Sequence, residues 1–260
     1  MRLAMALIFF AGPVTAAAAE PANQSFFGDG NYTNIASIGL VTTLGPTGLF
    51  QNPTSGITPK NAFSVESCMA FKENNGDHFQ ANGVLATYGV TDWLEIGGYG
   101  LFVYGLDPAA GGDSTLKSGN FNMRARLVRE LNGLPEITIG GIASFGDDPL
   151  VEQSLYVAAS KGFTLNDGQF LKSARIHGGI RESWPDLGDN ITTAFVGLEV
   201  EVVSNLFVIG DVNTRDGSFI RTPWSAGLQY KSSAFGFSAA VLQDPNETRE
   251  TYYVGIGVSY

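Results

Sequence analysis

Apolar and polar residues alternate along most of the chain from residue 63 onward. In the final stretch, Tyr252–Tyr260, every second residue is apolar or aromatic, and the residues between are Tyr, Gly or Ser. A period of two is that of a β-strand with one apolar face. The same period recurs in segments of about ten residues that are separated by turn signals. We predict twelve strands, at 63–71, 79–90, 93–104, 119–130, 136–145, 153–163, 170–181, 192–203, 205–213, 220–231, 234–242 and 251–260.

The connections between these segments alternate strictly between short and long. Short turns are predicted at 91–92, 132–133, 166–168, 204 and 232–233, and longer connections near 72–78, 105–118, 146–152, 182–191, 214–219 and 243–250. Outer-membrane barrels have an even number of strands, short periplasmic turns and longer external loops. We therefore predict an all-β fold, an antiparallel transmembrane β-barrel of twelve strands, with ten to fourteen also compatible. Taken by itself, the last strand would also fit a soluble β-sandwich.

The ionic side chains share one face within each predicted strand. At 119–130, Phe121 and Leu127 fall on one face, and Arg124 and Arg126 fall on the other. A charge facing lipid costs about 2–4 kcal/mol near the bilayer midplane, so the ionic face is predicted to look inward. Two interpretations remain open, a salt-bridged interior and an arginine-lined path for an anionic sugar or a small anion. The predicted lumen-lining residues are Arg124, Arg126, Arg175, His177, Arg181, Arg221, Glu95, Glu199 and Glu201, with Asp211 beside them.

The N-terminal region lacks this alternation and divides into two parts. Residues 1–19 combine a basic start, a short apolar run and small residues before Glu20, which predicts a secretory signal peptide. Residues 20–62 are rich in Pro, Gly, Asn and Thr. We expect this second part to be a periplasmic or lumenal segment, either a plug inside the barrel or a cover at its mouth. The barrel itself is predicted to span 63–260.

Composition narrows the function further. The formal charge is −10, from 15 basic and 25 acidic residues, which argues against a nucleic-acid partner. The single cysteine, Cys68, excludes an internal disulfide and a cysteine-based metal site. The two histidines, His78 and His177, fit no known catalytic pattern. We predict no enzyme activity, no catalytic residue, no cofactor and no metal. An outer-membrane barrel hydrolase is the second alternative function, after the two that are given at the end of this section.

Two resemblances add to this interpretation. The last strand resembles the C-terminal insertion signal of bacterial outer-membrane barrels, through Tyr253, Gly255, Val258 and Tyr260. This resemblance implies recognition by the barrel-assembly machinery, contact with outer-membrane lipid and residence in the outer membrane of a Gram-negative bacterium.

The stretch Gly45–Thr54, followed by Pro59–Val65, resembles the entry motif of the YjbH-type outer-membrane proteins. Those proteins are several times longer and are typically lipoproteins, whereas this sequence has no cysteine near the predicted cleavage site. The resemblance implies a non-enzymatic barrel that assists exopolysaccharide secretion, with polysaccharide as a partner, or that supports envelope structure. The alternative function is a narrow pore for anionic oligosaccharides or small anions.

Overall fold

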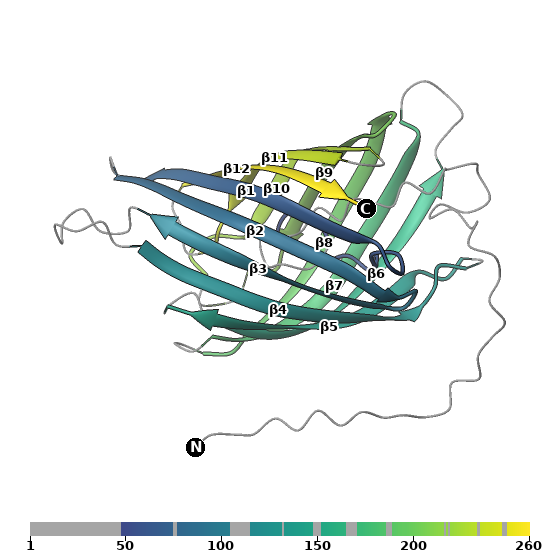
Figure 1. Cartoon of the computed structure of the whole chain (residues 1–260), viewed down its shortest axis with the longest axis horizontal. Helices are drawn as coiled ribbons and strands as arrows, with labels where there is room; N and C mark the ends of the chain where they lie inside the picture. Colours follow the sequence, from purple (N-terminus) through teal and green to yellow (C-terminus); the bar gives the residue numbers. More distant parts are fainter. Residues whose placement is uncertain are drawn as a thin grey trace, which may run out of the picture.

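The computed structural model describes residues 48–74, 77–104, 115–131, 133–147, 152–164, 171–185, 189–215, 217, 219–232, 235–245 and 249–260. The predicted signal peptide and residues 20–47 lie outside these ranges. The described residues form twelve strands that close into one antiparallel barrel (Figure 1). The strands are β1 (Phe63–Asn74), β2 (Asp77–Thr91), β3 (Leu94–Tyr104), β4 (Thr115–Val128), β5 (Glu136–Gly146), β6 (Glu152–Thr164), β7 (Ser173–Pro185), β8 (Ile191–Val203), β9 (Leu206–Asn213), β10 (Trp224–Lys231), β11 (Phe235–Gln243) and β12 (Thr251–Ser259).

Each strand pairs with its neighbours in sequence, and β1 pairs with β12 to close the sheet. The closing register runs from Ser64 opposite Ser259 to Phe71 opposite Tyr252. The predicted fold class and strand count are therefore confirmed. Closure matters physically, because a sheet in lipid must satisfy every backbone N–H and C=O group internally.

The outer wall is apolar and carries aromatic side chains at both ends. Exposed Phe121, Ile139, Val157 and Leu198 lie in the middle of their strands. The rings at the end where β1 begins are Phe63, Tyr88, Trp93, Phe163, Phe235 and Tyr260, and those at the other end are Phe71, Phe102, Tyr104, Phe145, Trp224 and Tyr252. Two aromatic belts about a hydrophobic band are typical of a barrel that spans a membrane. Within the described ranges, no helix is long and apolar enough to cross a membrane.

Three predicted details of the strand ends are wrong. The predicted loop at 72–78 is instead the tip of a hairpin, since Lys72 pairs with Phe79 and Asn74 with Asp77. Short and long connections therefore do not alternate strictly. Trp184 lies in β7, paired with Gln153, rather than in a loop. Backbone pairing continues through these polar ends because the ladder needs no apolar side chain once it has left the hydrocarbon.

Candidate functional site: the barrel lumen

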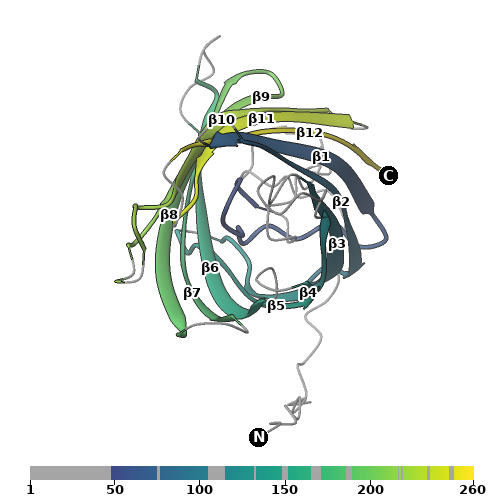
Figure 2. The same cartoon turned by 90° about the vertical axis from the view of Figure 1, so that its left-hand side faces the viewer.

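The inside of the barrel is crossed by part of the N-terminal region. Figure 2 views the barrel along its axis and shows this stretch, in dark purple, within the ring of strands. Residues 48–58, which we call the lumenal segment, are nearly all buried. They contact strands on opposite sides of the wall through three polar centres and one apolar cluster. The predicted domain boundary at residue 62 thus falls just after this segment, one residue before β1 begins.

The first polar centre is a buried ion pair between β3 and β4. Nε of Arg124 lies 2.8 Å from Oε1 of Glu95, and the two residues are 1% and 0% exposed. They stand directly opposite each other in register. The lumenal segment binds to both, because the backbone N–H of Thr58 donates to Glu95 (2.7 Å) and Arg124 donates to the carbonyl of Thr54 (3.0 Å). The pair therefore holds the segment to the wall as well as joining two strands.

The second centre is built around the carboxylate of Glu136 at the start of β5. Nε of Arg126 lies 2.7 Å from its Oε1, and a guanidinium nitrogen of Arg175 lies 2.8 Å from its Oε2. Arg175 also contacts Glu130, at 3.3 Å, and so bridges two carboxylates. The hydroxyl of Ser55 donates to Glu136 (3.3 Å), which ties the lumenal segment into this network.

The third centre lies across the lumen, on β9. Asp211 accepts hydrogen bonds from the side-chain amide of Asn52 (2.9 Å), the hydroxyl of Ser225 (2.7 Å) and the backbone N–H of Gln51 (3.4 Å). The side-chain amide of Gln51 donates in addition to the carbonyl of Gln243 (3.2 Å). The segment therefore runs from β9 and β11 at residues 51–52 to β3–β5 at residues 54–58.

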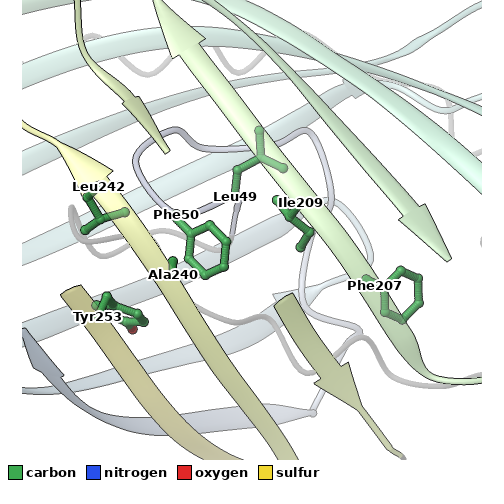
Figure 3. Close-up of a cluster of buried hydrophobic side chains, with 7 residues drawn as sticks. All are labelled: Leu49, Phe50, Phe207, Ile209, Ala240, Leu242 and Tyr253. Carbon is green, nitrogen blue, oxygen red and sulfur yellow. The ribbon is translucent and has the colours of Figure 1, made fainter. Parts of the chain in front are cut away.

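Two large apolar side chains anchor the beginning of the segment. Leu49 and Phe50 are 0% and 3% exposed and pack in one cluster with Phe207, Ile209, Ala240, Leu242 and Tyr253 of the wall (Figure 3). The ring of Phe50 meets that of Tyr253 edge to face, with 6.1 Å between centroids. Burial of two such side chains supplies the main apolar contribution to docking of the segment.

Glycines on the wall make room for the segment at both of its ends. A Cβ added at Gly89 would overlap the carbonyl oxygens of Thr58 and Pro59, and one at Gly197 would overlap the side chain of Leu49. Residue 60 also forms a parallel bridge with Gly89. The close approach of backbone to backbone at Gly89 is possible only without a side chain.

We expect Gly89→Ala to displace residues 58–60 from β2. The added methyl group meets backbone rather than a flexible side chain, so the cost is that of overpacking, about 1–3 kcal/mol. The measurement is limited proteolysis of the folded protein, with cleavage within 48–62 increased, together with urea unfolding in lipid vesicles. Gly100→Ala is the matched control, because no described atom lies within 4 Å of a Cβ at that position. Equal protection of the two variants from proteolysis would contradict the close backbone contact at Gly89.

Of the predicted lumen-lining residues, Arg124, Arg126, Arg175, Arg181, His177, Glu95, Glu199 and Glu201 lie on the inward faces of their strands. Glu199 pairs with Lys231, at 2.9 Å, and Glu201 accepts from Ser173, at 3.2 Å. Arg221 is the exception, since it is exposed and precedes β10, so the predicted strand start at 220 is wrong. Pro223 has no N–H for the ladder, which delays the strand to Trp224.

Arg181 of β7 differs from the other inward arginines. Its Nε and one terminal nitrogen are buried, and neither has a hydrogen-bond partner among the described residues. Thr193 stands directly opposite it on β8 and is 2% exposed, and its hydroxyl also lacks a partner in the described part of the chain. Glu152 and Asp211 act on Arg181 electrostatically, but neither forms an ion pair with it in the described structure.

Ser160 and His177 form a close pair that the sequence did not predict. The hydroxyl of Ser160 lies 2.8 Å from Nδ1 of His177, and both side chains are buried. The backbone N–H of Ser55 donates to the same hydroxyl (3.2 Å), so the lumenal segment covers it. Nε2 of His177 has no hydrogen-bond partner in the described ranges. A nucleophilic serine needs a base that a third group orients, and these residues do not supply one.

The residues of the predicted assembly signal divide between the two faces of β12. Tyr253 and Gly255 are buried on the lumenal side, and the hydroxyl of Tyr253 donates to Glu66 (2.8 Å). Val258 and Tyr260 are exposed on the outer wall. In the described part of the chain, no group of three or more His, Cys, Asp or Glu side chains is arranged to hold a metal ion.

Comparison with known proteins gives the fold and no family. No protein-family model matches the chain, and no curated protein matches it. Among solved structures, a KdgM porin is similar with a TM-score of 0.53 and 10% identity, covering 76% of this chain and 99% of that one. An outer membrane channel from Pseudomonas putida F1 is similar with a TM-score of 0.52 and 13% identity, covering 78% and 96%. The KdgM porin in complex with disordered oligogalacturonate has a TM-score of 0.50 and 11% identity, covering 76% and 98%.

The similar solved structures and the apolar outer wall lead to the same conclusion. The chain is an outer-membrane β-barrel, located in the outer membrane of a Gram-negative bacterium and in contact with its lipid.

Proposed function

We propose that this protein is a narrow outer-membrane channel for anionic saccharides, constricted by its lumenal segment. The observation that carries the proposal is Arg181, which has two buried guanidinium nitrogens without a hydrogen-bond partner among the described residues. The other three inward arginines are neutralised by Glu95, Glu136 and Glu130. A guanidinium stays charged at every physiological pH and matches a carboxylate with two parallel hydrogen bonds. An anionic solute that enters the lumen would satisfy this charge.

The wall also suits a polar solute in general. Most inward side chains carry hydroxyl, amide or ionic groups, and the sheet is closed, so a polar path is separated from lipid. The similar KdgM porin binds oligogalacturonate, a chain of sugar acids, in its own complex. The likeness of fold makes the same class of solute a reasonable choice for this chain, and Arg181 supplies the chemical reason.

We expect Arg181→Gln to reduce the preference of the channel for anions. One unit charge in contact with an ion is worth about 1 kcal/mol at water-like dielectric, or roughly fivefold in relative permeability. The measurement is the reversal potential across a planar bilayer in a potassium chloride gradient. Arg129→Gln is the control, because this substitution removes the same charge and Arg129 is exposed just beyond the end of β4. An identical reversal potential in the two variants would refute the role of Arg181, and absence of any conductance, both with and without a saturating anionic saccharide, would refute the channel.

Assistance of exopolysaccharide secretion, which the YjbH resemblance implies, stays a prediction. The residues that carry the resemblance include Leu49–Thr54, whose contacts inside the barrel already account for their composition. Deletion of the gene, with measurement of matrix sugar outside the cell, tests this role. Recognition by the barrel-assembly machinery also remains a proposal.

A further inference from the structure

We infer that the wall groups that hold residues 51–58 form a saccharide-binding site, and that the lumenal segment occupies this site as an internal competitor. The choice of a saccharide rests on the proposed function. The site comprises Glu95 and Arg124 on one side of the lumen, Glu136 and Ser160 near them, and Asp211 on the far side. A solute of this class would displace the segment and would open the lumen as it binds.

The hydrogen bonds of the segment define what the site accepts. The segment mostly donates: its N–H and O–H groups reach Glu95, Glu136, Ser160 and Asp211. In the opposite direction, Arg124 donates to the carbonyl of Thr54. A row of carboxylates that accept hydrogen bonds calls for a ligand with many hydroxyl donors, and a saccharide has one on most carbons. The segment thus presents to the wall the same kind of groups as a saccharide would.

The charge on the ligand follows from Arg181. Arg181 stands opposite Thr193 of β8, and Asp211 stands opposite Gly197, four residues further along the same strand. Asp211 accepts a hydrogen bond from Asn52 and so marks one end of the site. Hydroxyls directed to Asp211 would place a carboxylate of the same chain near Arg181 and Thr193. A saccharide whose units carry both groups, a uronate oligomer, satisfies the acceptors and the guanidinium of Arg181 together. A neutral oligomer would leave Arg181 as it is in the free protein.

The segment is held by contacts that can be exchanged. Its apolar anchors are Leu49 and Phe50, which pack against a cluster separate from the carboxylates. Its polar contacts are single hydrogen bonds of the kind that a ligand can replace. Loosening the anchors therefore raises the fraction of molecules with an open site without altering the groups that bind the ligand. Apparent affinity rises in proportion to that fraction.

The test compares the parent with Leu49→Ala combined with Phe50→Ala, in lipid vesicles or detergent micelles. Tetragalacturonate is the probe, maltotetraose is its neutral counterpart, and affinity is measured by titration calorimetry. We expect the double variant to bind tetragalacturonate about tenfold more tightly, because a tenfold increase in the fraction of molecules with an open site gives a tenfold increase in apparent affinity. Leu127→Ala is the matched control, because Leu127 is an exposed side chain of the outer wall. Gly89→Ala loosens the other end of the segment and provides a second variant.

Release of the segment is followed independently by labelling. In a Cys68→Ala background, Thr54→Cys places a thiol on the segment while leaving the carbonyl that Arg124 contacts. We expect saturating tetragalacturonate to accelerate its reaction with a water-soluble maleimide at least several-fold, and maltotetraose to do so less. Equal affinity in the parent and both loosened variants, or labelling unchanged by tetragalacturonate, would overturn the competition. Equal binding of the two probes would overturn the uronate assignment.

The two proposals fail separately. If the ion selectivity depends on Arg181 but tetragalacturonate does not release the lumenal segment, this inference is overturned and the proposed function stands. Binding and release without any conductance supports the site and refutes the channel.

Discussion

Arg124→Met is expected to lower the free energy of unfolding by about 3–5 kcal/mol, the usual result of removing one partner of a buried ion pair. Glu95 is completely buried, so its carboxylate would lose its cation with no access to water. The substitution also removes the donor to the carbonyl of Thr54, which holds the lumenal segment. The measurement is urea unfolding in lipid vesicles, followed by the change in tryptophan fluorescence.

A double variant separates the charge from the packing. Arg124→Met combined with Glu95→Leu removes both charges, and replacing a buried pair with apolar residues is often nearly neutral. We therefore expect the double variant to recover most of the stability that the single variant loses. The backbone N–H of Thr58 would still lose its acceptor, so recovery stays incomplete. A single variant as stable as the parent would contradict the structural role of the pair.

The two-residue period predicted which side chains face the lumen, and the reason is geometric. Successive side chains of a strand point to opposite faces, so placing Phe121 in lipid requires Asn122 and Arg124 to face inward. Charged residues in lipid are costly enough to fix the choice of face. The same argument placed Glu95 and Arg175 inside without any knowledge of their partners. Fold class, strand count and facing were therefore accessible from the sequence.

Strand ends were less accessible, because outside the hydrocarbon the period disappears while the backbone ladder continues. Residues 72–74 and 77–78 are polar and still pair across the β1–β2 hairpin. Arg221 has the parity of an inward residue, yet it precedes β10, because Pro223 has no N–H and interrupts the ladder. The N–H of Arg221 still donates to the carbonyl of Pro245 (3.0 Å). Side-chain pattern reports the environment, whereas backbone pairing depends on available N–H and C=O groups.

The contacts of the lumenal segment could not be predicted from the sequence. Asn52 and Asp211 are separated by 159 residues, and Ser55 and Glu136 by 81. No periodicity relates such positions. The segment has no helical or strand period that would determine which of its side chains point to the wall. One signal was present: Leu49 and Phe50 are large apolar side chains in a polar stretch, which indicates burial of that stretch against something apolar.

Deletion of Tyr260 is expected to impair closure of the barrel and its insertion in the membrane. Phe63 and Tyr260 exchange two backbone hydrogen bonds, of 2.9 and 3.0 Å, and their rings stack with 5.2 Å between centroids. The deletion leaves the backbone groups of Phe63 unpaired at the edge of the β1–β12 seam. Both residues lie in the aromatic belt rather than in the hydrocarbon, so the loss of two backbone hydrogen bonds weakens the seam by about 1–3 kcal/mol. The measurement is the folded fraction in outer-membrane preparations, from the mobility of unheated samples in gels.

Two further variants assign the cause of such a loss. Tyr260→Phe keeps the backbone pairing and the stacked ring, and is expected to insert like the parent. Phe63→Ala keeps the backbone pairing and removes the stack, so its effect measures the ring contact alone. A defect in the deletion that exceeds the defect in Phe63→Ala points to the backbone seam or to recognition of the last strand. Folding of purified protein into vesicles, where no assembly machinery is present, then distinguishes these two. A deletion that inserts normally in cells would contradict both the seam argument and the proposed assembly signal.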